Sequence, residues 1–184
     1  MGKIPDHAKR VFNGVIFDIY QWEQTLYDGS TTIFEKAKRP DSVVVLAVNG
    51  NKILVARDEQ PTASPVTTLP GGETERGDTP EAAARRELLE ETGYHAATWE
   101  LFGSESIDST KIDWTIHYFI ARNLKKVAAP DPGPGEMITP HWVPFEEFVD
   151  LTRQPDFRNI YFSLLFHRSS PEEIETFRQR LFAA

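Results

Sequence analysis

Three glutamates and one arginine in a short stretch of the sequence could together bind a divalent cation. Glu87, Glu90 and Glu91 follow one another at helical spacing, and Arg86 directly precedes them. On an α-helix, side chains at this spacing share a face. Like charges on one face repel, so the arrangement makes sense if divalent cations lie among the carboxylates. Mg²⁺ prefers oxygen ligands and bridges phosphate oxygens well, and Arg86 can hold the rotamer of a carboxylate by pairing with it.

The same spacing is also found on an ordinary solvated helix that is rich in acidic residues, and Glu-x-x-Glu-Glu alone favours that plainer interpretation. The flanking residues favour the metal-binding interpretation instead. Thr79 and Pro80 predict a helix start, as N-cap and first helical residue, and Gly93 predicts its end. The loop before the helix is rich in glycine, which lets the backbone approach the site closely, so the Gly71 carbonyl can be a further ligand.

Composition limits the kind of site and of partner. The 184 residues suit one compact domain, and 40% of them are hydrophobic, enough for a core. The absence of cysteine excludes disulfides and thiolate ligands, and the five histidines lack metal-ligand spacing. A metal should therefore be a hard cation with oxygen ligands.

The net charge of -8 argues against a nucleic-acid partner, and no apolar stretch approaches the length of a membrane span. We expect a soluble cytoplasmic protein.

The segment before the glycine loop predicts strands separated by turns. Asp28-Gly29 and Asn49-Gly50 are turn signals, and Val43–Val48 is a continuous apolar run, as in a strand buried on both faces. Residues 58–69, which include Pro61 and Pro65, are predicted to be irregular. The predicted strands are Val11–Tyr20, Thr31–Lys36, Val43–Val48 and Lys52–Arg57.

The segment after the glycine loop predicts helices and strands together, so the fold class is α/β (α+β). Trp114, Ile116, Tyr118 and Ile120 fall on one face of a predicted strand. Residues 127–135, rich in Pro and Gly, could be a linker, but too little chain follows for another domain, which favours a functional surface loop. Strands are predicted at Trp99–Ile107, Trp114–Ala121 and His141–Val143, and helices at Glu81–Thr92, Phe145–Leu151 and from Pro171 onward.

The segment from Gly71 to Tyr94 resembles the Nudix box. That pattern is Gly, five residues, Glu, seven residues, then Arg-Glu-apolar-x-Glu-Glu-x-Gly-apolar, and the chain departs from it only where Asp78 replaces a glutamate. The family's metal ligands carry over to Glu87, Glu90, Glu91 and the Gly71 carbonyl, with Mg²⁺ as the metal and Mn²⁺ able to substitute. The resemblance implies an α/β/α sandwich with a mixed central sheet.

The N-terminal residues resemble those of the ADP-ribose pyrophosphatases and nucleoside-diphosphate-sugar hydrolases. Gly14-Val15-Ile16-Phe17, Asp28-Gly29 and Val43-Val44-Val45 carry this likeness. In those relatives the extension forms a small antiparallel sheet that swaps between two subunits, which implies a homodimer. We therefore expect an extension at residues 1–39 and a catalytic core at 40–184. Trp22 either stacks on the substrate base or packs in the dimer core.

Two further residues are site candidates. Gly135-Glu136-Met137-Ile138 resembles the late loop of the same subgroup, so Glu136 is either the catalytic base or a surface glutamate. Glu87 is the competing base. Arg57 either holds a phosphate or is a solvated charge at a strand end. The subgroup's proline after the box is absent from Ile107-Asp108-Ser109-Thr110-Lys111, which widens the expected substrate class to nucleoside diphosphate sugars, ADP-ribose included.

The resemblance implies hydrolysis of a pyrophosphate bond, with Arg86 among the catalytic residues. Two other functions stay open. A nucleoside triphosphate sanitising pyrophosphatase is disfavoured by the long N-terminal extension. A non-catalytic ligand-binding module of the same fold is disfavoured because such proteins usually lose box carboxylates, and this chain keeps Glu87, Glu90 and Glu91.

Overall fold

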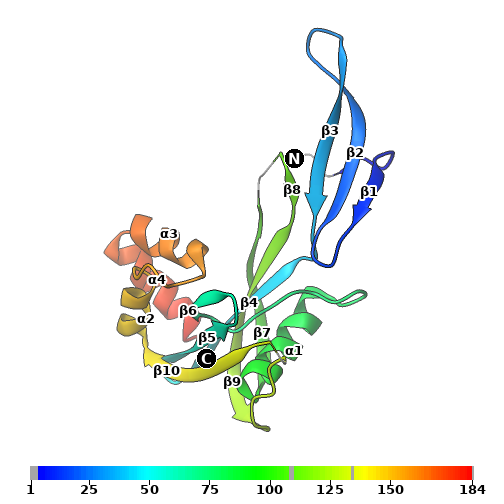
Figure 1. The fold of residues 1–184 in the computed structure, drawn as a ribbon. Helices are drawn as coiled ribbons and strands as arrows, with labels where there is room; N and C mark the ends of the chain where they lie inside the picture. The colour runs from blue at the N-terminus through cyan, green and yellow to red at the C-terminus, as the bar shows by residue number, and fades with distance from the viewer. Residues whose placement is uncertain (1–3, 108–109, 134, 184) are drawn as a thin grey trace.

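The central sheet of the protein is mixed and carries the site. The computed structural model describes residues 4–107, 110–133 and 135–183. The sheet order is β10-β5-β4-β9-β7, with β6 paired to β5 (Figure 1). Strand β4 is parallel to β9, and the other pairs are antiparallel. The strands are β4 (Ser42–Asn49), β5 (Lys52–Gln60), β6 (Ala63–Thr68), β7 (Tyr94–Ser106), β9 (Thr115–Lys126) and β10 (Met137–Pro144).

Helices cover both faces of this sheet, so the predicted α/β/α sandwich is confirmed. Because side chains alternate along a strand, Val43 and Val45 of β4 face one helix, whereas Val44 and Leu46 face an aromatic-rich cluster from the other helices. No helix in the described part of the chain is long and apolar enough to span a membrane. The helices are α1 (Pro80–Thr92) on one face and α2 (Phe145–Leu151), α3 (Ile160–Arg168) and α4 (Pro171–Leu181) on the other.

Helix α1 begins and ends where its sequence predicts. The Thr79 hydroxyl accepts a hydrogen bond from the Ala82 N–H at 3.2 Å, and Pro80 occupies the first turn. Gly93 adopts φ 72°, a left-handed conformation suited to glycine, and donates to the Leu89 carbonyl at 2.8 Å. Both ends of the acidic helix are therefore fixed by local chemistry.

The N-terminal residues form a second sheet that projects away from the core (Figure 1). Its parallel β3–β8 pairing is short, with Ala37 opposite Ile112 and Lys38 opposite Asp113. Several of its apolar side chains are exposed, among them Phe12 and Ile33. Its strands, in sheet order, are β1 (Lys9–Asn13), β2 (Asp18–Thr25), β3 (Thr31–Lys38) and β8 (Ile112–Asp113).

Two predictions about the strands are wrong. The Val11–Tyr20 segment is two strands, because Gly14 donates to the Phe17 carbonyl at 3.0 Å and closes a turn. Residues 58–69 are not irregular, since β5 continues and β6 pairs with it. Pro65 is tolerated there because, among the strands that the structure describes, β6 pairs with β5 alone, and its ladder shifts register near this residue.

Candidate active site

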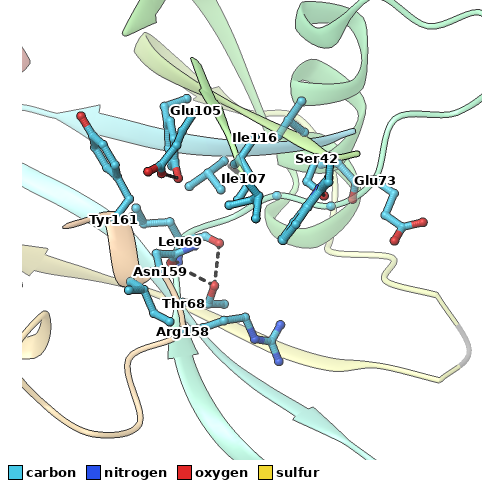
Figure 2. Close-up of a pocket in the computed structure, with 18 of the residues that line it drawn as sticks. Ser42, Thr68, Leu69, Glu73, Glu105, Ile107, Ile116, Arg158, Asn159 and Tyr161 are labelled. Atoms are coloured by element: carbon cyan, nitrogen blue, oxygen red, sulfur yellow. Dashed lines mark hydrogen bonds between the residues drawn. The ribbon is translucent and has the colours of Figure 1, made fainter. Parts of the chain in front are cut away.

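A cavity of about 1460 Å³ lies where α1, the glycine loop, β9 and α3 meet. Figure 2 shows Glu73 and Ser42 at one side of this cavity and Tyr161 and Asn159 at another. The cavity collects the metal-site residues predicted from the sequence together with the loop glutamate. They are Gly71, Arg86, Glu87, Glu90, Glu91 and Glu136.

Arg86 fixes the carboxylates of α1, as its position in the sequence predicts. Its Nη1 donates to Glu87 Oε1 at 2.8 Å and to Glu90 Oε2 at 3.0 Å. Its Nη2 donates to the Glu73 carbonyl of the glycine loop at 2.9 Å. One guanidinium thus orients two acidic side chains and ties the loop to the helix.

The backbone at Gly71 faces the acidic helix. The Pro70 and Gly72 carbonyls accept hydrogen bonds from β4, at Val45 N (2.8 Å) and Val43 N (2.9 Å). Since backbone groups alternate along an extended chain, the intervening Gly71 groups point away from β4. Its N–H donates to Glu91 Oε2 at 2.9 Å. The Gly71 carbonyl is therefore not used by the β4 ladder.

Neither glycine leaves room for a side chain. Gly71 has φ 153°, and a Cβ there would lie 2.1 Å from the Val43 carbonyl oxygen. A Cβ on Gly72 would lie 2.5 Å from the Glu87 carboxyl group. The two glycines therefore allow the loop to pass directly against the carboxylates.

Burial raises the pKa of two of these carboxyl groups. Glu91 is 7% exposed, and its burial, opposed by the Gly71 N–H bond and reinforced by the charges of Glu87 and Glu136, raises its pKa to about 8. Burial also raises the pKa of Glu87, against the lowering effect of Arg86. Without a cation, the site therefore disfavours the ionised form of both groups.

The donor set fits a hard divalent cation. Carboxylate oxygens and a backbone carbonyl are ligands that such ions prefer, and a positive charge would relieve the crowding of buried carboxylates. Within residues 4–107, 110–133 and 135–183, no three acidic or histidine side chains are arranged so that they could bind a metal ion together without moving. Arg86 binds one carboxylate oxygen of Glu87, Oε1, and one of Glu90, Oε2.

Glu136 lies next to the carboxylates of the box although it is distant in sequence. It precedes β10 and lines the same cavity. Its charge contributes to the raised pKa of both Glu87 and Glu91, which reflects its proximity to them. The fold therefore brings the two candidate bases together.

Trp22 and Arg57 do not border the cavity within one chain. Trp22, in the N-terminal sheet, packs edge-on against Phe34, with ring centroids 5.9 Å apart. Arg57 donates from Nη1 to Asp156 Oδ2 at 3.0 Å and is half-exposed. Their predicted roles in substrate binding stay predictions.

Several cavity residues were not predicted as site residues. Arg39 lies over the Trp114 ring, 4.4 Å from its centroid, and pairs with Glu73. Tyr118 stacks on Tyr161 with centroids 4.5 Å apart. The shared face of Trp114 and Tyr118 was recognised in the sequence, but as an apolar strand face, and Arg39 carried no signal.

Known proteins share both sequence and fold with this chain. An ADP-ribose pyrophosphatase of Bacillus subtilis (strain 168) is 33% identical over 118 residues, 63% of this chain and 64% of that protein. A methanol dehydrogenase activator of Bacillus methanolicus is 31% identical, covering 68% and 71% of the two chains. An ADP-sugar pyrophosphatase of Mus musculus is 32% identical, covering 64% of each. The chain thus spans less than two thirds of the length of two of these relatives.

A solved structure, described as an ADP compounds hydrolase, has the same fold. It superposes with a TM-score of 0.74 over 95% of this chain and 92% of its own, at 18% sequence identity. The family model of the NUDIX domain matches residues 38–164, which is more than half of the chain and includes the whole acidic helix. This protein is therefore a member of the Nudix family.

Proposed function

We propose that this protein hydrolyses the pyrophosphate bond of nucleoside diphosphate sugars such as ADP-ribose, releasing a nucleoside monophosphate and a sugar phosphate. The observation that carries the proposal is the cluster of carboxylates beside Gly71 in one large cavity, with Glu91 buried. Ligand sites commonly measure about 300–1,000 Å³, so this cavity has room for a two-part substrate. The two relatives known as ADP-ribose and ADP-sugar pyrophosphatases support the same substrate class.

The proposed site holds Mg²⁺, which Mn²⁺ can replace, on Glu87, Glu90, Glu91 and the Gly71 carbonyl. When bound, such an ion neutralises phosphate charge and lowers the pKa of a bound water. Arg86 orients the Glu87 and Glu90 carboxylates through its hydrogen bonds. Glu136 or Glu87 accepts the proton of the attacking water.

A panel of nucleotides tests this function. With Mg²⁺, ADP-ribose should yield AMP and ribose phosphate, and other nucleoside diphosphate sugars should yield the matching monophosphates. Release of pyrophosphate from nucleoside triphosphates, with no product from ADP-ribose, would instead support a sanitising enzyme. If the protein binds ADP-ribose but turns over no member of the panel, the binding-module alternative holds. Omission of the divalent cation is the control for each substrate.

We propose a homodimer in which residues 1–39 form the extension that exchanges with a second subunit and residues 40–184 form the catalytic core. The exposed apolar side chains of the N-terminal sheet, such as Phe12 and Ile33, support this assembly because burial would remove them from water. A cytoplasmic location remains a prediction from the sequence.

The Trp22→Ala variant tests the dimer and separates the two roles of this residue. Sizing of the unmodified protein should give a dimer, and a monomer would contradict the exchange. If Trp22 stacks on the base, the variant stays dimeric and KM for ADP-ribose rises about tenfold with kcat preserved, because one stacked base contributes on the order of 1–3 kcal/mol. If Trp22 packs in the dimer core, the variant elutes as a monomer.

A further inference from the structure

The short segment before α3 binds the edge of β6. The Thr67 N–H donates to the Asp156 carbonyl at 2.9 Å, and the Arg158 N–H donates to the Thr67 carbonyl at 2.9 Å. Phe157 forms a parallel bridge with Thr67 and is buried in the core. This part of the chain therefore continues the sheet beyond β6, directly beside the strand end that leads to the glycine loop.

Asn159 completes this contact with its side chain. Its Oδ1 accepts a hydrogen bond from the Leu69 N–H at 2.8 Å. It also lies 3.2 Å from the Thr68 hydroxyl, whose one proton is shared with the Leu69 carbonyl at 3.0 Å (Figure 2). Asn159 occupies the N-cap of α3, where an asparagine commonly accepts from its own helix. Here it makes no side-chain cap bond. The side-chain oxygen is thus used for the strand end instead of the helix.

The Leu69 N–H needs this acceptor. Leu69 is 2% exposed, and Pro70 has no N–H, so Leu69 provides the last backbone donor before Gly71. On the other side of the same backbone, the Pro70 carbonyl accepts from Val45 of β4. The backbone leading to Gly71 is therefore held from two sides, by β4 and by Asn159.

We infer that Asn159 is a positioning residue for the divalent cation site. The inference rests on the proposed function, since it takes the Gly71 carbonyl as a ligand. The side-chain hydrogen bonds of Asn159 reach neither the acidic helix nor Gly71. They hold Leu69 in place, and the position of Leu69 fixes the direction of the Gly71 carbonyl through Pro70. Groups that hydrogen-bond a metal ligand directly typically contribute about 10- to 100-fold to metal affinity or activity, and because Asn159 acts two residues away from Gly71 we expect an effect at the lower end of that range.

Titration of the substrate-free protein with Mn²⁺, followed by electron paramagnetic resonance, tests the role of Asn159 apart from turnover. The Asn159→Ala variant should bind Mn²⁺ about tenfold more weakly or worse. Asn159→Asp keeps an oxygen that can accept from Leu69 and should bind Mn²⁺ about as tightly as the unmodified protein. Asn159→Gln moves the acceptor by one methylene and should weaken binding. The comparison of Asp with Gln decides the matter even if the alanine variant does not fold.

The Thr152→Ala variant is the matched control. Thr152 is buried, and its hydroxyl donates to the Val149 carbonyl at 2.7 Å, so its removal lowers the melting temperature without touching the strand end. It should leave Mn²⁺ affinity unchanged. Unchanged affinity in folded Asn159→Ala, or equal loss in the Asp and Gln variants, would overturn the inference. Failure of the unmodified protein to bind Mn²⁺ or to hydrolyse ADP-ribose would instead count against the proposed function.

Discussion

The Glu91→Gln variant should lose about a thousandfold in kcat with ADP-ribose and saturating Mg²⁺. Metal stabilisation of a phosphoryl transition state is worth several kcal/mol, and each 1.4 kcal/mol corresponds to about tenfold in rate. The glutamine is nearly isosteric, and its amide oxygen can still accept from the Gly71 N–H, as Glu91 does at 2.9 Å. The loss should therefore reflect the missing charge and not a displaced loop.

The same variant should be more stable than the unmodified protein when no metal is present. The pKa of Glu91 is raised by burial from 4.5 to about 8. For a carboxyl group with a raised pKa, the folded state binds a proton that the unfolded state has released, so stability falls as pH rises from about 4.5 to 8. Glutamine removes this effect, and its advantage should grow across that window to a few kcal/mol, at about 1.4 kcal/mol per pKa unit.

Steady-state assays and thermal unfolding in a chelator, each at pH 5, 7 and 9, measure these effects. Glu81→Gln is the matched control, since Glu81 lies on the same helix, is exposed and pairs with Arg85 outside the cavity. It should retain normal turnover and gain no such pH-dependent stability. Normal kcat in Glu91→Gln, and likewise in Glu90→Gln, would refute the metal assignment.

The Glu136→Gln and Glu87→Gln variants should separate the two candidate bases. If Glu136 is the base, its variant loses about 10²–10⁴-fold in kcat and keeps its affinity for Mn²⁺, because general base catalysis contributes in that range. Glu87→Gln then loses both turnover and metal affinity. If Glu87 combines both roles, Glu136→Gln turns over ADP-ribose nearly as fast as the unmodified protein.

Turnover and Mn²⁺ binding must be measured on the same preparations to distinguish these outcomes. Glu147→Gln is the control, because Glu147 is an exposed glutamate of α2 that does not line the cavity. It should change neither quantity. A pH–rate profile adds an independent criterion, since loss of the base should remove the acidic limb of kcat/KM.

The acidic helix could be predicted from the sequence because its determinants are local. Thr79, Pro80 and Gly93 fix its ends, and the spacing of Glu87, Glu90 and Glu91 determines their common face. At the one position that departs from the motif, Asp78 accepts a hydrogen bond from the Glu75 N–H at 3.4 Å, within an exposed part of the loop.

The part of the cavity formed by α3 could not be predicted, because the contacts that place this helix join residues distant in sequence. Helix α3 was not predicted, and its N-cap residue Asn159 bonds to Leu69, ninety positions earlier. No local pattern marks such a contact. The split between β1 and β2 was missed for a related reason: Val15 is a strand-forming residue by type, yet it lies fully exposed in a turn.

The short pairing of β3 with β8 divides the protein into parts of unequal local stability. Elements with few buried contacts open with a lower free energy than the core. Ile16 lies in the turn between β1 and β2 of the N-terminal sheet and also lines the cavity. Warming should therefore loosen the part of the cavity lined by Ile16 before it loosens α1, which carries the carboxylates. Substrate affinity should then decline at temperatures at which the carboxylate cluster is still intact.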